Sequence, residues 1–158
     1  MRQNLYFLLS IFLLLSCGTQ KSATNVNSHE DETVLVISYN QTSGYSKINP
    51  VYKIELYSNR QMYLTATKNL NKEGKYLRTI SEKEYKQVIT SFNSANFFDF
   101  EDEYTSTITD LPTHYLYFKS NGKEKKVKNY YGAPEELKEL EYLMQSFLDR
   151  VGWEKMSW

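Results

Sequence analysis

Apolar and polar residues alternate with the period of β-strands between residues 33 and 80. Thr33–Tyr39 is instead a continuous apolar, β-branched run, which is typical of a strand in the middle of a sheet. The alternating segments that follow are separated by turns rich in Ser, Asn and Gly. The predicted strands of this half are 33–39, 51–57, 62–67 and 75–80.

The period changes to that of a helix after Ile80. Ser81 and Glu84 have the spacing of a capping box, in which each side chain bonds the backbone N–H of the other residue. The first helix is predicted to end near 93–96, and its apolar stripe is Tyr85, Val88, Ile89 and Phe92. A second helix is predicted from Pro134 to Gly152, with the stripe Leu137, Leu140, Met144, Phe147, Leu148 and Val151.

Two further strands lie between the predicted helices. Residues 113–120 alternate, Asn121-Gly122 is a strong hairpin signal, and 123–131 return. The order is therefore β-β-β-β-α-β-β-α. We expect a single α+β domain over 33–152. It consists of an antiparallel sheet of about five to six strands with both helices packed on one face.

The N-terminus has a different pattern. Leu5–Leu15 is apolar except for Ser10, which suits the apolar core of an export signal and is too short to span a bilayer. Leu14-Leu15-Ser16-Cys17 resembles the lipobox of bacterial lipoproteins. That resemblance implies cleavage before Cys17 and acylation of its thiol and new amine, which together give stable membrane anchoring. A plain secretory signal or a short signal-anchor is the alternative.

The predicted organisation is a signal peptide at 1–16, a polar flexible tether at 17–32, the folded domain at 33–152 and a tail at 153–158. Cys17 is the only cysteine, so acylation accounts for a thiol that is otherwise unpaired. By the sorting rules of such lipoproteins, Gly18 implies the outer membrane, on either its periplasmic or its outer face.

Charge excludes some function classes. The chain has 19 basic and 19 acidic residues, and loss of Arg2 with the signal leaves 18 against 19. A nucleic-acid partner is therefore not expected. Separately, we expect the domain to be a monomer. The 14 tyrosines are explained by strand packing or by a face that contacts a protein or glycan.

Several stretches resemble a family of domains of unknown function found in bacterial envelope lipoproteins. They are Pro50–Ser58, Gly74–Tyr76, Asn96–Asp99, Thr109–Thr113 and Tyr131–Pro134, and the likeness covers about 33–150. It implies a fold and a compartment rather than a reaction. Family members often have a Cys pair in the loop before the first hairpin and Asp-Gly in its turn; here the loop Ser43–Pro50 has no Cys, and the turn is Asn59-Arg60.

No sequence motif of a nucleophile, zinc protease or P-loop is present, and no cofactor or metal site is predicted. The acidic run Asp99–Glu103 has no glycine spacing of a calcium loop and is interpreted as a solvated loop. Five lysines of the second hairpin either block edge pairing or contact anionic groups: Lys119, Lys123, Lys125, Lys126 and Lys128.

Asp110, in Thr-Asp-Leu-Pro, either caps its own turn or lines a small cleft with Tyr130 and Tyr131. His114 shares a face with Leu116 and Phe118, which favours a packed histidine over a catalytic one. These four residues are the candidate ligand-binding set. We expect a non-enzymatic binding or scaffold module; the alternative is an enzyme or enzyme accessory acting on an envelope substrate near Asp110.

Overall fold

The computed structural model describes residues 32–108 and 110–157. The predicted signal peptide, Cys17 and the tether up to Asp31 lie outside the described residues. The chain from Glu32 onward is one compact unit. Within this described part, none of the helices has the length and apolarity needed to cross a membrane.

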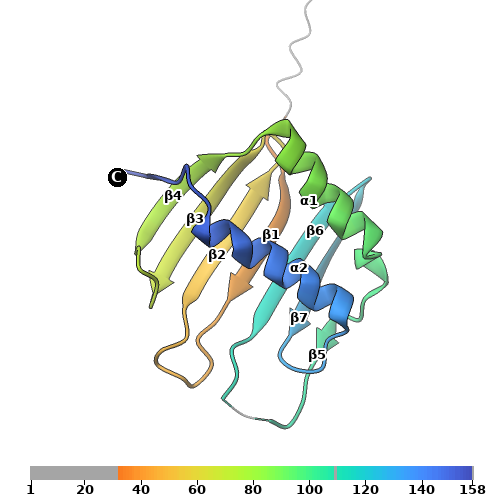
Figure 1. Cartoon of the computed structure of the whole chain (residues 1–158). Coiled ribbons are helices and arrows are strands. Elements are labelled where there is room, and N and C mark those ends of the chain that lie inside the picture. The colour runs from red at the N-terminus through yellow and green to blue at the C-terminus, as the bar shows by residue number, and fades with distance from the viewer. Residues whose placement is uncertain (1–31, 109, 158) are drawn as a thin grey trace, which may run out of the picture. The chain divides into compact units, whose positions relative to one another are not determined.

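The unit is built on one open sheet (Figure 1). Neighbouring strands are antiparallel except for β5 and β7, which are parallel. Across the sheet the strands stand in the order β5-β7-β6-β1-β2-β3-β4-β8. Their bounds are β1 Leu35–Gln41, β2 Val51–Tyr57, β3 Gln61–Lys68, β4 Gly74–Thr79, β5 Glu103–Tyr104, β6 His114–Ser120, β7 Lys123–Asn129 and β8 Glu154–Lys155.

The α+β prediction and the order of the long elements are confirmed, whereas the expectation of five to six strands, all antiparallel, was too simple. The two additional strands are edge strands of two residues each, too short to show an alternating pattern. Tertiary hydrogen bonds create them. The Tyr130 N–H donates to the Tyr104 carbonyl over 2.8 Å, and the Met156 N–H donates to the Lys75 carbonyl over 2.9 Å. The sheet therefore includes residues beyond Gly152.

Both helices cover the same face of the sheet (Figure 1). Helix α1 (Glu82–Ser94) begins with the predicted capping box between Ser81 and Glu84. Helix α2 (Glu135–Gln145) begins after Pro134 and continues as the 3₁₀ turn η2 (Ser146–Asp149). The prediction that this helix runs to Gly152 was wrong.

Side-chain bonds from elsewhere take up the carbonyls where a longer helix would have continued. Trp153 Nε1 donates to the Phe147 carbonyl over 2.8 Å, and Arg78 Nε donates to the Val151 carbonyl over 3.0 Å. Val151, which was placed in the apolar stripe, is 89% exposed. The chain therefore leaves the helix early and reaches the sheet edge as β8.

The core lies between the sheet and the helices. Alternate strand residues face it, for example Ile37, Ile54 and Leu64, all fully buried. An aromatic cluster fills one side, where Phe92, Phe97 and Phe118 have ring centroids 5.1–5.8 Å apart. Phe97 belongs to the short 3₁₀ helix η1 (Phe97–Asp99). This layer is apolar except at one end, where polar side chains replace hydrocarbon.

Candidate functional site

Among residues 32–108 and 110–157, three polar or charged residues are buried: Gln41 (7% exposed), Asn129 (8%) and Glu141 (5%). Gln41 ends β1, Asn129 ends β7, and Glu141 lies on α2. Strand register brings the first two together, because Gln41 pairs with His114 and His114 pairs with Asn129. Gln41, His114 and Asn129 therefore form a row across adjacent strands, and Glu141 of α2 lies over it, in a bond with Asn129.

Tyr39 is the centre of the hydrogen bonds on one side of this row. Its hydroxyl donates to Gln41 Oε1 over 3.2 Å, accepts from Gln145 Nε2 over 2.7 Å and lies 2.6 Å from His114 Nδ1. The hydroxyl has one hydrogen. We assign that hydrogen to the bond with Gln41, so that Nδ1 carries a proton and donates to the hydroxyl. Burial lowers the pKa of His114, which favours the neutral ring. The neutral ring then leaves Nε2 as an acceptor.

Glu141 is the carboxyl group on the other side. Its Oε1 accepts from Asn129 Nδ2 over 2.8 Å, and the ion-pair distance from Oε2 to His114 Nδ1 is 3.8 Å. Burial raises the pKa of Glu141 to about 7, against the opposite effects of the Asn129 bond and of the Lys138 charge. Burial also raises the pKa of Tyr39, so this hydroxyl stays protonated.

Asn129 Oδ1 is the unsatisfied atom of this cluster. It is buried and has no hydrogen-bond partner in the described structure, where the other such side-chain atom is Arg78 Nη1, away from the cleft lining. Leaving a buried polar atom unpaired costs about 1–3 kcal/mol, and such atoms are rare in folded proteins. An unpaired acceptor beside a poorly stabilised carboxyl group is an arrangement that a bound ligand would complete.

A cleft of about 400 Å³ opens over this cluster. Its lining combines the buried polar groups with an aromatic rim, where Tyr131 is 50% and Tyr142 60% exposed. Lys138 also lies at the rim, with Nζ 3.3 Å from Glu135 Oε2. The lining residues are Leu111, Pro112, His114, Asn129, Tyr130, Tyr131, Gly132, Lys138, Glu141, Tyr142 and Gln145.

Two loops support the wall of the cleft. The loop after β1 is bonded to the loop before β6, since the Thr42 N–H donates to the Thr113 carbonyl over 3.0 Å. Gly44, at φ +59°, approaches so closely that an added Cβ would lie 2.3 Å from the Leu111 carbonyl oxygen. The Leu111 N–H in turn donates to the Tyr130 hydroxyl over 3.5 Å. Leu111 and Pro112 are thereby held at the cleft.

The structure brings together three of the four residues proposed from the sequence. His114, Tyr130 and Tyr131 line the cleft. Asp110 is exposed, has a φ of 76° and is not among the lining residues. The carboxyl group of the cleft is therefore that of Glu141.

Sequence reasoning did not identify Tyr39, Asn129, Glu141 or Gln145. For Glu141 a signal existed, because it follows Leu137 by four residues and so occupies the apolar stripe of α2, where a charged residue is unusual. Asn129 also occupies an inward position in the alternation of β7. Only the pairing of strands shows that these residues meet.

The acidic run and the lysines of the second hairpin pair with each other. Lys125 Nζ lies 3.0 Å from Asp102 Oδ1, and Lys128 Nζ lies 2.7 Å from Glu103 Oε1.

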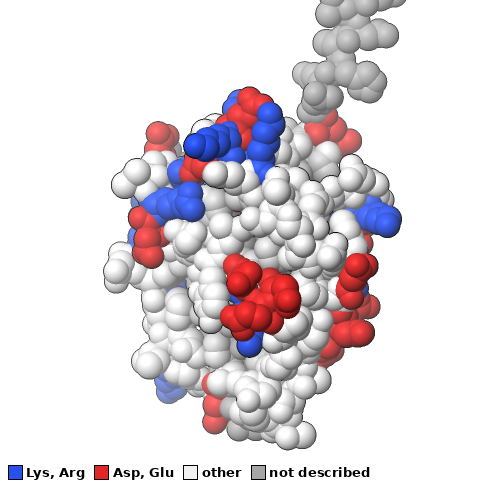
Figure 2. Space-filling model, turned by 45° about the vertical axis from the view of Figure 1, so that its right-hand side comes forward, with Lys and Arg blue, Asp and Glu red and all other residues white. Residues whose placement is uncertain are grey.

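In the part of the chain that the structure describes, no three His, Cys, Asp or Glu side chains are grouped to hold a metal ion. Figure 2 shows charged side chains in small clusters of both signs, with wide uncharged surface between them.

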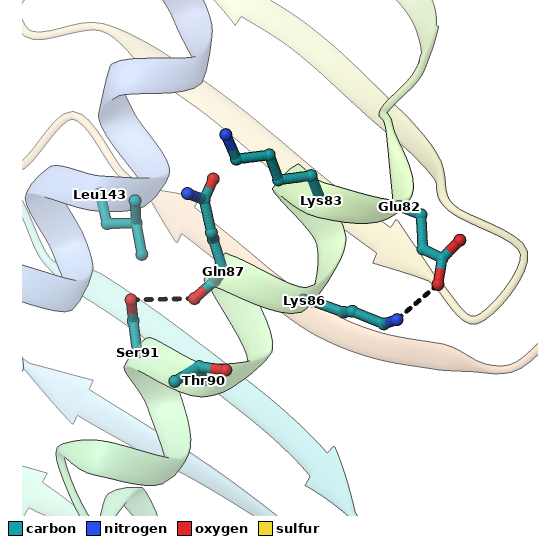
Figure 3. Close-up of a pocket in the computed structure, with 7 residues that line it drawn as sticks. All are labelled: Glu82, Lys83, Lys86, Gln87, Thr90, Ser91 and Leu143. Atoms are coloured by element: carbon teal, nitrogen blue, oxygen red, sulfur yellow. Dashed lines mark hydrogen bonds and ion pairs between the residues drawn. The ribbon is translucent and has the colours of Figure 1, made fainter.

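A larger hollow, of about 1000 Å³, lies between the two helices (Figure 3). Its polar groups are largely exposed and bond locally: Lys86 pairs with Glu82 over 2.5 Å, and Ser91 Oγ donates to the Gln87 carbonyl over 3.1 Å. Leu143 of α2 is its apolar wall (Figure 3). The hollow contains no buried polar group, so we place the candidate site in the cleft above Glu141.

Chemically, the cleft can accept hydrogen bonds and exchange a proton near neutral pH. A carboxyl group with a pKa near 7 has the acidity that acid–base work needs. The lining residues include no Ser, Thr or Cys, so the side chains that most often act as covalent nucleophiles are missing from this lining.

Comparison with known proteins gives a family. The family model of the domain of unknown function DUF6438 matches residues 35–148, which span every long strand and both helices. Among curated proteins, none matches the chain. The cleft lies within the matched range. The chain belongs to the DUF6438 family of domains of unknown function.

Proposed function

We propose that the protein is a lipid-anchored envelope protein whose α+β domain binds a ligand non-enzymatically in the cleft above Glu141. The observation that carries the binding role is the buried, unpaired Asn129 Oδ1 in a cleft with an aromatic rim. Ligand sites typically combine a mostly apolar lining with a few polar groups that fix orientation. A protein or glycan of the envelope supplies the ligand.

The anchor rests on the export signal and on the lipobox-like Leu14–Cys17. The described domain fits this arrangement. The chain enters β1 at Leu35, whereas the cleft lies at the Gln41 end of the same strand, about 20 Å away at 3.3 Å per residue. A tether that enters there leaves the cleft at the opposite end of the domain.

One observation favours the alternative of an enzyme or enzyme accessory. Glu141, with its pKa raised to about 7, lies beside a neutral His114 in the same cleft, a pair suited to general acid–base catalysis. In that case Glu141, and not Asp110, is the carboxyl group that acts. We place binding first because the lining offers no hydroxyl or thiol nucleophile of Ser, Thr or Cys.

The cleft is tested by NMR. We would titrate the ¹⁵N-labelled full chain, in detergent micelles, with soluble glycan fragments released from purified envelopes. Binding should shift the side-chain amide signals of Asn129 and Gln145 and leave the fragments chemically unchanged. Asn69 is the internal control, because its side-chain amide donates to Lys47 and Asn49 carbonyls in a different part of the domain.

Two results count against the proposal. Fragments recovered in altered form by wild type, but intact from Glu141→Gln, would establish the enzyme instead. Equal shifts at Asn69 and Asn129, or none at either with any envelope fraction, would mean that the cleft is not a binding site.

The anchor is tested separately by metabolic labelling with radioactive palmitate. Wild-type protein should incorporate the label and stay with the membrane fraction, and Cys17→Ser should lose both properties. Label retained by Cys17→Ser would overturn the anchor and leave the cleft proposal untouched.

A further inference from the structure

We infer that the group received by the cleft is a primary ammonium group of the ligand, held by Asn129, Glu141 and His114. This inference rests on the proposed binding function and names the chemistry of the bound group. An amino sugar, a lysine side chain and an ethanolamine headgroup all carry such a group.

The first argument is the count of unused hydrogen-bonding atoms. Asn129 Nδ2 donates one of its two hydrogens to Glu141, and Asn129 Oδ1 is unpaired. Glu141 Oε2 has no contact shorter than the 3.8 Å to His114 Nδ1. His114 donates from Nδ1 to Tyr39, which leaves Nε2 as an acceptor. With this tautomer, the atoms that can still accept a hydrogen bond here include Asn129 Oδ1, Glu141 Oε2 and His114 Nε2, and an ammonium group has three donors.

Gln145 and Gln41 do not change this balance. Gln145 Nε2 is already bonded to the Tyr39 hydroxyl, and Gln41 Nε2 is bonded to the Pro50 carbonyl over 3.2 Å. Each of these amide nitrogens therefore uses one of its two hydrogens within the protein. A ligand group that only accepts hydrogen bonds, such as a carboxylate or phosphate, would leave Asn129 Oδ1 unpaired and would place a second negative charge beside Glu141.

The second argument is charge. Glu141 is 5% exposed, and its bond to Asn129 is the only short hydrogen bond that its carboxyl group makes in the described structure. A buried carboxylate is stabilised best by a cation in direct contact. The sheet faces it with the neutral rings of His114, Tyr39 and Tyr52, so the opposite charge is missing from that side.

Lys138 is the one cation in the lining of the cleft, and its charge acts on Glu141 from the same helix. Its ammonium group pairs with Glu135 at the rim, 3.3 Å away, and its side chain is 40% exposed. The Lys138 ammonium group therefore leaves the floor of the cleft open to the ammonium group of a ligand. Because the two groups have the same charge, Lys138 also repels the ligand weakly. This gives a variant, Lys138→Met, with a predicted gain of binding.

The rim suits the same ligand. Tyr131 and Tyr142 present exposed rings at the mouth. Aromatic faces attract cations and also pack on the apolar part of a ligand. The complete arrangement, acceptors at the floor and rings at the mouth, is that of an ammonium site.

The test compares ammonium probes with neutral counterparts of similar size, by following the Asn129 side-chain signal of the full chain in micelles. Propylammonium is compared with 1-propanol, and glucosamine with N-acetylglucosamine. We expect propylammonium, which keeps its proton at pH 8, to bind about tenfold or more tightly than 1-propanol at that pH. The glucosamine pair is compared at pH 7, because the amine of glucosamine loses its proton near pH 8. Between pH 8 and pH 6 propylammonium binding should weaken about tenfold, as Glu141 takes up a proton.

Variants separate the floor from the rest of the helix. Glu141→Gln keeps the bond to Asn129 and loses the charge, so ammonium binding should fall about tenfold or more. Glu139→Gln makes the same change at an exposed position of α2 and should bind like wild type. Lys138→Met should bind about two- to threefold more tightly, because a like charge is removed.

The source of the ammonium group is read from glucosamine and two further probes, Nα-acetyl-lysine amide and phosphoethanolamine. Any of them binding more tightly than its N-acetylated form supports the inference, and the tightest one identifies the class of ligand. The inference is overturned if the neutral probes bind as tightly as the ammonium probes, or if Glu141→Gln binds the ammonium probes as tightly as wild type.

The outcomes also separate this inference from the proposed function. If envelope fragments shift Asn129 while every ammonium probe fails, the cleft binds a ligand of another class and only this inference falls. If neither fragments nor probes move Asn129, both fall.

Discussion

Two glutamates, Glu84 at the start of α1 and Glu141 within α2, show how differently one fold treats the same side chain. Glu84 Oε1 accepts from Arg78 over 2.8 Å and from Arg150 over 3.1 Å, while Oε2 accepts from Ser81. The Arg78 bond is the main cause that lowers the pKa of Glu84 to about 2. Burial instead raises the pKa of Glu141 to about 7.

The difference separates a structural carboxylate from a candidate functional one. The bonds of Glu84 join the helix cap to β4 and to the segment after η2: Oε1 has two charged partners, and Oε2 accepts from Ser81. Glu141 has one amide partner and lies next to an unpaired acceptor. A fold that needed only stability would not keep a carboxyl group in that state. We therefore associate the unsatisfied group with ligand binding.

The largest effect is expected from Glu84→Gln. Loss of the charge leaves Arg78, 12% exposed, without its carboxylate, and the free energy of unfolding at pH 7 should fall by about 3 kcal/mol. Glu82→Gln is the matched control in the same helical turn. Its ion pair with Lys86 is largely exposed, so Glu82→Gln should leave the free energy of unfolding nearly unchanged. Urea unfolding that gave equal losses for both variants would contradict the structural role of Glu84.

A medium effect on stability is expected from Gly44→Ala, at the wall of the cleft that contains Glu141. The new Cβ would overlap the Leu111 carbonyl and the residue would keep a positive φ, so unfolding should become easier by about 2 kcal/mol. Gly122→Ala also has a positive φ but has nothing within 4 Å of the new Cβ, and should cost about 1 kcal/mol. Thermal unfolding measures both. If the two variants lost the same stability, the close approach behind the cleft wall would be of no consequence.

The smallest effect, and the one of opposite sign, is expected from Glu141→Gln. The raised pKa means that the folded protein holds a proton on Glu141 between pH 4.5 and about 7, where the unfolded chain has released it. This group therefore lowers stability as pH rises through that window. At pH 8 the variant should be more stable than wild type, by about 1 kcal/mol.

The pH profiles should differ in the same way. Burial lowers the pKa of His114, so the free energy of unfolding also falls as pH falls below 6.5. Both proteins share this contribution. It cancels when the free energy of unfolding of Glu141→Gln is subtracted from that of wild type at each pH. The difference should become more negative between pH 4.5 and 7. For Glu84, stability is lost as pH falls from 4.5 towards 2. A Glu141→Gln variant that lost stability at pH 8 would place Glu141 with Glu84 as a structural group.

Much of the fold could be predicted from local patterns. The capping box at Ser81 and Glu84, the hairpin at Asn121-Gly122 and the alternating strands are all present where the sequence placed them. The second helix ends before its predicted last residue, and beyond its end the carbonyls of Phe147 and Val151 accept bonds from the side chains of Trp153 and Arg78, which lie outside the predicted helix. No local pattern contains such partners.

The candidate site shows the same limit. His114, Tyr130 and Tyr131 were within reach of sequence reasoning because they are chemically unusual residues beside loops. Asp110 was proposed for the same reason, but its loop places it outside the cleft. The carboxyl group that lines the cleft is instead that of Glu141 on α2. The apolar stripe of a helix shows which side of the helix is buried but does not show which strands that side covers.

The sequence by itself determined the kinds of elements, their order and which side of each strand and helix is apolar, because these follow from periodicity and caps within a few residues. Only the tertiary structure decided that Gln41, His114 and Asn129 stand in one row under Glu141. It also decided the opposite pKa shifts of Glu84 and Glu141, because burial and hydrogen-bond partners set them and those come from distant parts of the chain. Cys17 and the proposed anchor depend on the sequence alone.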